Sequence, residues 1–216
     1  MIWFTSDTHF GHANVLQFCD RPFATIEAMD RGLVANINAC VGLRDHLYIL
    51  GDFSYKSTAE QAREIRKRIN CENVHLVPGN HDKDWTQPAV SGTFIVEPPI
   101  VTLKERGRKL VLCHYPMVDW RGLAHAAIHL HGHIHAPREY NEWNRANRVL
   151  RYDVGVDAND CRPISLPEVF AYFKDVEPRR RATREQWVAL TTMGEPDAAG
   201  AFPQGVAPSA AELDAQ

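Results

Sequence analysis

The chain has 216 residues, 44% of them hydrophobic, and a formal net charge of −3. This length and apolar content suit one domain with a single large core. The slight acidic excess argues against a generally basic protein that coats nucleic acid, although a local basic groove stays open. Met1 leads straight into an apolar run, and no apolar stretch approaches the roughly 18 residues that span a bilayer. We therefore expect a cytoplasmic protein that does not bind membranes.

Short apolar runs alternate with helical patterns, as in layered α/β domains. The predicted strands are Ile2–Ser6, His46–Leu50, Val74–Val77, Thr93–Val96, Ile100–Lys104, Lys109–Cys113, Ala127–Leu130 and Arg148–Val156. The predicted helices are Thr25–Cys40, Thr58–Ile69 and Leu166–Phe173. Ser57 with Glu60, and Ser165 with Glu168, have the spacing of a capping box at the start of the second and third helices. Gly107 predicts a hairpin turn between the fifth and sixth strands.

The composition changes near the C-terminus. After about Thr191 the chain is rich in Ala, Gly and Pro and has few large apolar residues. Such a segment cannot bury enough apolar surface to fold. We expect a domain over residues 1–190 and a disordered tail over residues 191–216. Five cysteines without a CxxC pair predict reduced thiols and no disulfide framework.

Polar side chains follow five of the predicted strands at the point where each strand ends. They are Asp7 and His9, Asp52, Asn80, His114, and His133 with His135. We expect them to converge, because ligands bind at the carboxyl ends of strands in α/β sheets. Residues i and i+2 of an extended segment point the same way, so the Asp7–His9 and His133–His135 pairs can each bind a metal from one strand end. Oxygen and imidazole ligands without a thiolate suit Mn²⁺, Fe or Zn²⁺.

Each motif alone is compatible with an ordinary structural role. Asp7-Thr8-His9 and Gly51-Asp52 are typical of polar turns, and His114 alone is typical of a partly buried histidine. The alternation of His131, His133 and His135 is harder to explain structurally, because imidazoles on one face repel one another when protonated. His131 faces either the core or the site, with the core slightly favoured. The ordered combination of the motifs favours a metal centre.

Taken in chain order, the motifs resemble the signature of the calcineurin-like metallophosphoesterase superfamily: D-x-H, G-D, G-N-H-D/E, H and G-H-x-H. Every element is present, over roughly residues 1 to 175. The segment Thr5–His12 is also similar to a compact bacterial and phage branch of that superfamily. The resemblance implies a single-domain α/β fold, a four-layer α/β/β/α sandwich with two metals at one edge.

The resemblance also implies the ligand set. The first metal is expected on Asp7, His9, Asp52 and His135, and the second on Asp52, Asn80, His114 and His133. Asp52 is expected to bridge the two. Both ions are expected to be divalent; Mn²⁺ is favoured, and Fe, Zn²⁺ and Ni²⁺ stay open.

The resemblance places His81 over the leaving group as the general acid, and we expect Asp82 to orient it. His12 and Asn14 are candidates for contacting phosphate or for supporting the ligands. Arg21 and Arg138 are the arginines nearest to motifs and therefore candidate donors to the substrate phosphate, although a solvated surface arginine is the commoner case.

The expected reaction is phosphoester hydrolysis by a hydroxide that two metals activate. A compact domain without an inserted cap favours a phosphodiesterase acting on small or nucleotide-like diesters. A phosphomonoesterase (protein or nucleotide phosphatase) stays open, because the same cage attacks both esters. A nuclease is less favoured, since the sequence offers only short basic runs.

The non-enzyme alternative is a metal-free binding module with the same fold. Trp85, Trp120 and Trp143 are candidates for stacking on a base or aryl group, with packing expected for at least two of them. The oligomeric state stays open.

Overall fold

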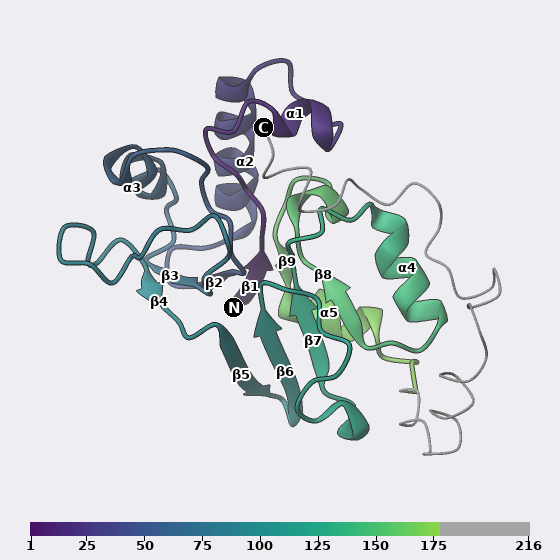
Figure 1. Ribbon diagram of the computed structural model, residues 1–216. Helices are drawn as coiled ribbons and strands as arrows, with labels where there is room; N and C mark the ends of the chain where they lie inside the picture. Colours follow the sequence, from purple (N-terminus) through teal and green to yellow (C-terminus); the bar gives the residue numbers. More distant parts are fainter. Residues whose placement is uncertain (178–216) are drawn as a thin grey trace, which may run out of the picture.

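The chain forms two β-sheets that pack face to face between outer layers of helices (Figure 1). The computed structural model describes residues 1–177. The first sheet has the strand order β4-β3-β2-β1-β9. Its strands are β1 (Ile2–Thr5), β2 (His46–Ile49), β3 (Asn73–Leu76), β4 (Ile95–Val96) and β9 (Ile164–Ser165). Strands β1 to β4 are parallel, so their carboxyl ends lie at one edge, and β9 is antiparallel to β1.

The second sheet has the strand order β5-β6-β7-β8. Its strands are β5 (Ile100–Glu105), β6 (Arg108–Cys113), β7 (Ile128–His131) and β8 (Arg151–Asp153). Strands β5 and β6 form the predicted hairpin, whose two turn residues Arg106 and Gly107 have φ of 47° and 79°. Two positive φ angles suit the tight turns that join twisted antiparallel strands. Strands β6, β7 and β8 are parallel.

Helices cover the outer face of each sheet. They are α1 (Val15–Phe18), α2 (Ile26–Cys40), α3 (Ala59–Lys67), α4 (Arg138–Ala146) and α5 (Leu166–Tyr172), with 3₁₀ turns at Leu123–His125 and Val156–Ala158. Met29, Leu33 and Ile37 of α2 recur every four residues, so they form one buried face against the first sheet. None of the helices within residues 1–177 has the length and apolar character needed to cross a bilayer.

Alternate residues of the first sheet contribute to two different cores. Leu47 and Ile49 of β2 lie in the core beneath α2, whereas Tyr48 and Leu50 lie in the core shared with the second sheet. This alternation follows from the two-residue period of a strand, which sends successive side chains to opposite faces. On the far side of the second sheet, α4 packs on β8. The four-layer α/β/β/α sandwich is therefore confirmed.

The predicted elements agree with the structure except at a few places. The capping box of α5 forms as predicted, but that of α3 uses Thr58 and Gln61, because the helix begins one residue later than predicted. Helix α4 was missed because its buried side chains are Tyr140 and two asparagines, which give no apolar period. The short elements α1 and β9 were missed as well. The predicted domain boundary at 190 and the tail over 191–216 lie outside the described residues.

Candidate metal centre

The polar side chains that follow the strands converge at one edge of the sandwich. Six of the seven predicted ligands form two clusters, in each of which the candidate ligand atoms lie within 4.8 Å of one another. The clusters are Asp7, His9 and His135, and Asp52, His114 and His133. Each cluster combines side chains that follow strands of both sheets. Strands β1 and β2 belong to the first sheet, and β6 and β7 to the second sheet.

Asp52 belongs to the second cluster and also reaches the first. Its Oδ2 atom is 3.5 Å from Nε2 of His9 and 3.4 Å from Nε2 of His114. The seventh predicted ligand, Asn80, belongs to the second cluster, with its Oδ1 atom 2.9 Å from Nε2 of His114. One carboxylate oxygen therefore reaches both groups of imidazoles.

Imidazole nitrogens face each other within both clusters. Nε2 of His9 is 3.1 Å from Nε2 of His135, and Nδ1 of His133 is 3.2 Å from Nε2 of His114. Burial, aided by the neighbouring His135, holds the pKa of His9 well below its usual value. Burial and the neighbouring His114 lower the pKa of His133 to about 4. Burial thus favours the neutral, metal-binding form of His9 and His133, and imidazoles that converge with carboxylates and an amide oxygen form a donor set that fits divalent cations.

Five of the seven predicted ligands have a left-handed backbone, which corrects the expectation of extended D-x-H and H-x-H segments. These are Asp7 (φ 55°), His9 (47°), Asp52 (55°), His133 (74°) and His135 (46°). Non-glycine residues in this region cost on the order of 1 kcal/mol or more each, and such residues gather at functional sites. The N–H groups of Asp7 and His9 donate to the carbonyls of Gly51 and Asp52, at 3.1 and 3.0 Å, and hold the turn in place.

Gly132 leaves room for the first cluster. A Cβ atom at this position would overlap Oγ of Ser6 and Oδ2 of Asp7. These two atoms are hydrogen-bonded to each other, and the N–H of His133 donates to both carboxylate oxygens of Asp7, each at 3.0 Å. The Asp7 carboxylate therefore packs directly on the backbone of the loop that carries His133.

Asp82 has a role that the sequence did not predict, beside the predicted orientation of His81. Its carboxylate accepts the backbone N–H groups of Asp52, Gly79 and Phe53, at 2.8, 2.9 and 3.0 Å. The N–H of His81 in turn donates to Oδ1 of Asp52 at 2.9 Å. Asp82 therefore holds together the loops that follow β2 and β3, which fixes the position of Asp52.

Arg21 is buried rather than facing an incoming phosphate. Its guanidinium donates to both carboxylate oxygens of Asp157, at 2.7 and 2.9 Å, and to the carbonyls of Asp7 and Thr8, at 2.7 and 3.0 Å. Asp157 Oδ2 is also 2.7 Å from Nδ1 of His135. These contacts correct the interpretation of Arg21 as a substrate contact, because its donors are already engaged by the groups that support Asp7 and His135.

Asp157 was missed by sequence reasoning, although the rule that located the ligands also applies to it. It follows the predicted strand Arg148–Val156 just as the candidate ligands follow their strands. Burial would raise the pKa of Asp157, but Arg21 and His135 lower it to about 2. Burial alone would lower the pKa of His135. Asp157, Cys19 and Asp7 instead raise this pKa well above its usual value. Cys19 completes a third group with His135 and Asp157, but the charge of Arg21 beside Asp157 disfavours a cation there.

The remaining candidates lie at different distances from the clusters. His12 is buried and stacks on Tyr55, with ring centroids 3.9 Å apart, and its ring centroid is 5.4 Å from that of His9. His12 and Asn14 line a cavity of about 770 Å³. Arg138 is exposed on α4, within 4 Å of Glu142 and Asp160. His131 is fully buried, with Nε2 3.1 Å from the hydroxyl of Tyr140, so it belongs to the core.

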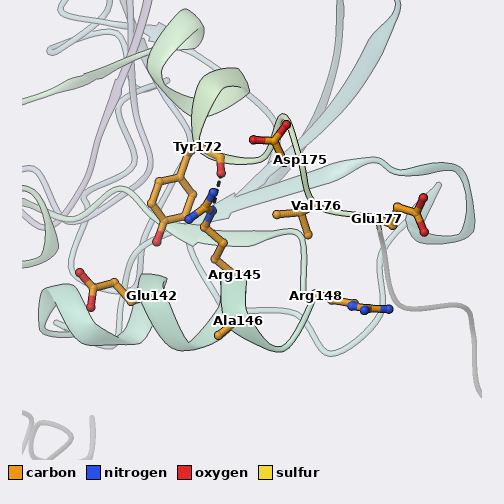
Figure 2. A pocket seen from close by; sticks show the side chains of 8 residues that line it. All are labelled: Glu142, Arg145, Ala146, Arg148, Tyr172, Asp175, Val176 and Glu177. Carbon is orange, nitrogen blue, oxygen red and sulfur yellow. Dashed lines mark hydrogen bonds between the residues drawn. The ribbon is translucent and has the colours of Figure 1, made fainter.

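A cavity of similar size, about 760 Å³, lies between α4 and the end of α5 (Figure 2). Its wall includes Glu142, Arg145 and Tyr172, and Arg145 Nε donates to the carbonyl of Tyr172 at 2.8 Å. None of the residues that line it belongs to the two ligand clusters. The metal centre and this hollow are therefore separate features of the described chain.

Comparison with known proteins agrees with this geometry. The chain is 34% identical over 168 residues to the uncharacterized protein MJ1445 of Methanocaldococcus jannaschii, covering 76% of this chain and 86% of that protein. It is 28% identical to the Gene 66 protein of Mycobacterium phage D29, covering 82% and 97%. The crystal structure of AQ665, a protein of unknown function from Aquifex aeolicus, matches with a TM-score of 0.61 and 26% identity, covering 79% of this chain and 98% of that one.

The profile of the calcineurin-like phosphoesterase superfamily domain matches residues 1–156, which include all seven candidate ligands. The chain therefore belongs to the calcineurin-like phosphoesterase superfamily, and its general chemistry is the metal-dependent hydrolysis of phosphoester bonds.

Proposed function

We propose that this protein is a phosphodiesterase that holds two divalent cations, with Mn²⁺ favoured, and acts on small or nucleotide-like phosphodiesters. The observation that carries the proposal is the position of Asp52, whose Oδ2 atom reaches an imidazole of each cluster within 3.5 Å. Two cations sharing such a carboxylate would lower the pKa of a shared water enough to supply hydroxide near neutrality.

The charge of the donor set favours an anionic substrate. Asp7 and Asp52 offset only half of the charge that two divalent cations carry, and the other donors are one amide and imidazoles, which bind a metal in their neutral form. The remaining positive charge can attract a phosphate and stabilise the charge that develops on its oxygens. A cage built only of carboxylates would repel the same substrate.

The open side of the centre supports a diester. Of the candidate ligands, Asn80 is exposed and His133 half-buried, whereas the others are buried; the neighbouring His81 is half-buried too. Solvent therefore reaches the two clusters past these three residues, and a diester can enter there with its two arms pointing away from the cations.

His81 is the proposed general acid. Its ring centroid lies 5.5 Å from that of His9, with the rings at 62°, and its side chain is half-buried. The ring is therefore next to the first cluster and within reach of solvent, as a group that protonates a leaving alkoxide must be.

The proposal is tested by metal analysis together with activity on bis(p-nitrophenyl) phosphate and p-nitrophenyl phosphate in Mn²⁺. The wild-type protein should contain two ions per chain and prefer the diester. Asn80→Ala and His114→Ala should each lose the second ion and most of the activity. Glu142→Gln, an exposed residue on the cavity in Figure 2, should match the wild type in both measurements.

Each alternative predicts a different result. A clear preference for the monoester would indicate a phosphomonoesterase, and steeply salt-dependent binding of DNA or RNA would indicate a nuclease. Less than one ion per chain would indicate a metal-free binding module. Full activity of either second-cluster variant would remove the second ion from the mechanism.

A further inference from the structure

Two tyrosine rings border the open side of the metal centre. The ring centroid of Tyr115 is 4.6 Å from that of His133 and 4.9 Å from that of His114. The ring centroid of Tyr55 is 4.9 Å from that of His81, with the rings nearly perpendicular at 82°. One tyrosine therefore lies beside the second cluster, and the other beside the proposed general acid.

The two rings differ in how exposed they are to solvent. Tyr55 stacks on His12, and Nζ of Lys56 lies 5.0 Å from its ring centroid. Tyr55 is only partly exposed, whereas Tyr115 is 46% exposed although its ring lies against the buried His114. Tyr115 therefore has the ring surface that a substrate can cover.

The backbone of Tyr115 is fixed even though its ring is exposed. The loop is anchored two residues further on, where the N–H of Met117 donates to Nε2 of the buried His129 at 3.0 Å. Tyr115 also follows directly on His114 at the end of β6. An aromatic ring held in this way loses little freedom when it stacks on a ligand.

The tryptophans that the sequence offered for stacking do not have this position. Trp85 and Trp120 are buried, so the expectation of packing for at least two tryptophans is confirmed. The indole N–H of Trp120 donates to the carbonyl of Ala127 at 2.9 Å. Trp143 lies on α4, on the outer side of the second sheet.

We propose that Tyr115 binds the retained arm of the diester, and that this arm is aromatic, either a nucleobase or an aryl group. The inference rests on the proposed phosphodiesterase function and names its substrate class. His81 and Tyr55 mark the side from which the leaving arm departs, because the general acid must touch the leaving oxygen. Tyr115 lies beside the other cluster, so it contacts the arm that stays on phosphorus.

The test uses two diesters with the same leaving group, phenyl p-nitrophenyl phosphate and methyl p-nitrophenyl phosphate. Any change in their ratio then reports on the retained arm alone. The wild-type protein should favour the phenyl diester roughly ten-fold or more in kcat/KM, mainly through KM, as expected for stacking on a tyrosine. Tyr115→Leu should bring this ratio close to one, and Tyr115→Phe should retain it.

Two controls separate this role from damage to the loop. Val118→Ala alters an 83% exposed residue of the same loop and should leave the ratio unchanged. A second measurement needs no variant: phenyl phosphate should inhibit the wild-type protein about ten-fold more strongly than methyl phosphate, because each is the product that keeps the retained arm.

Equal use of the two diesters by the wild-type protein, or equal inhibition by the two products, would overturn the inference. So would a Tyr115→Leu protein of normal metal content whose phenyl preference is unchanged. These results would leave the phosphodiesterase proposal standing. A wild-type protein that hydrolyses neither diester in Mn²⁺ would instead refute the phosphodiesterase proposal itself.

Discussion

Individual residues of the metal centre are held by contacts that span most of the chain. Arg21 binds Asp157 through two nitrogens, and Asp157 accepts from Nδ1 of His135. The same guanidinium binds the carbonyl of Asp7, so one side chain supports two members of the first cluster. A carboxylate on the far nitrogen of a ligating histidine fixes the tautomer of the ring and makes it a stronger donor to a metal.

We predict that Asp157→Asn weakens binding of the first ion by about 10- to 100-fold, because an amide carries no charge to strengthen the imidazole. Titration of the metal-free protein with Mn²⁺ measures this, and the second ion should bind as before. The matched control is Asp45→Asn. Asp45 also accepts several hydrogen bonds, from the N-terminal ammonium and from the indole N–H of Trp3. Unchanged affinity for the first ion in Asp157→Asn would contradict the assigned role.

We predict that His81→Ala slows hydrolysis of diesters with alkyl leaving groups much more than of diesters with p-nitrophenyl leaving groups. An alkoxide needs a proton as it departs, whereas p-nitrophenolate leaves without one. Rates on diesters that share a retained arm and differ in the leaving group measure the effect, typically 10²- to 10⁴-fold for loss of a general acid. An equal loss on both kinds of substrate would contradict the assignment.

At the scale of elements, short apolar runs in the sequence predict the strands and the ligands that follow them. Strands β1, β2, β3, β6 and β7 were each located from an apolar run, and the polar residue after each run located a candidate ligand. Helix α4 was not located, because it buries Tyr140, Asn141 and Asn144 rather than an apolar stripe. Periodicity detects apolar burial only, so a helix that docks through polar side chains gives no such signal.

Contacts between distant elements were the other part that the sequence did not predict. Asp82 was predicted to orient His81, but its contact with the backbone of Asp52, 30 residues away, was not foreseen. Arg21 and Asp157 are separated by 136 positions. Motif spacing reports which side chains leave the same strand end, but it does not report which buried donor meets which acceptor across the fold.

At the scale of the whole molecule, burial of neutral histidines in the second sheet makes stability depend on pH. His129 is fully buried, with Nδ1 3.0 Å from the carbonyl of Val111 and Nε2 accepting the N–H of Met117. Burial lowers its pKa to about 4. The unfolded chain therefore binds a proton at this position between about pH 6.5 and 4, and the folded chain does not.

We predict that His129 contributes stability that is fully present above about pH 6.5 and lost as the pH falls toward 4. Between pH 7.5 and 5.5 the loss for this one group is about 1.4 kcal/mol. Urea unfolding of the metal-free wild-type and His129→Gln proteins measures it, because other buried groups titrate in both and cancel in the difference. A variant as sensitive to pH as the wild type would contradict the prediction.

The metal centre also lies across the boundary between the two sheets. Asp7, His9 and Asp52 come from the first sheet, and His114, His133 and His135 from the second. Sliding one sheet over the other would therefore change the separation of the two ligand clusters as well as the shared core. The magnetic coupling between two Mn²⁺ ions bound there would depend on their separation. It would therefore report the alignment of the two sheets and respond to core substitutions far from any ligand.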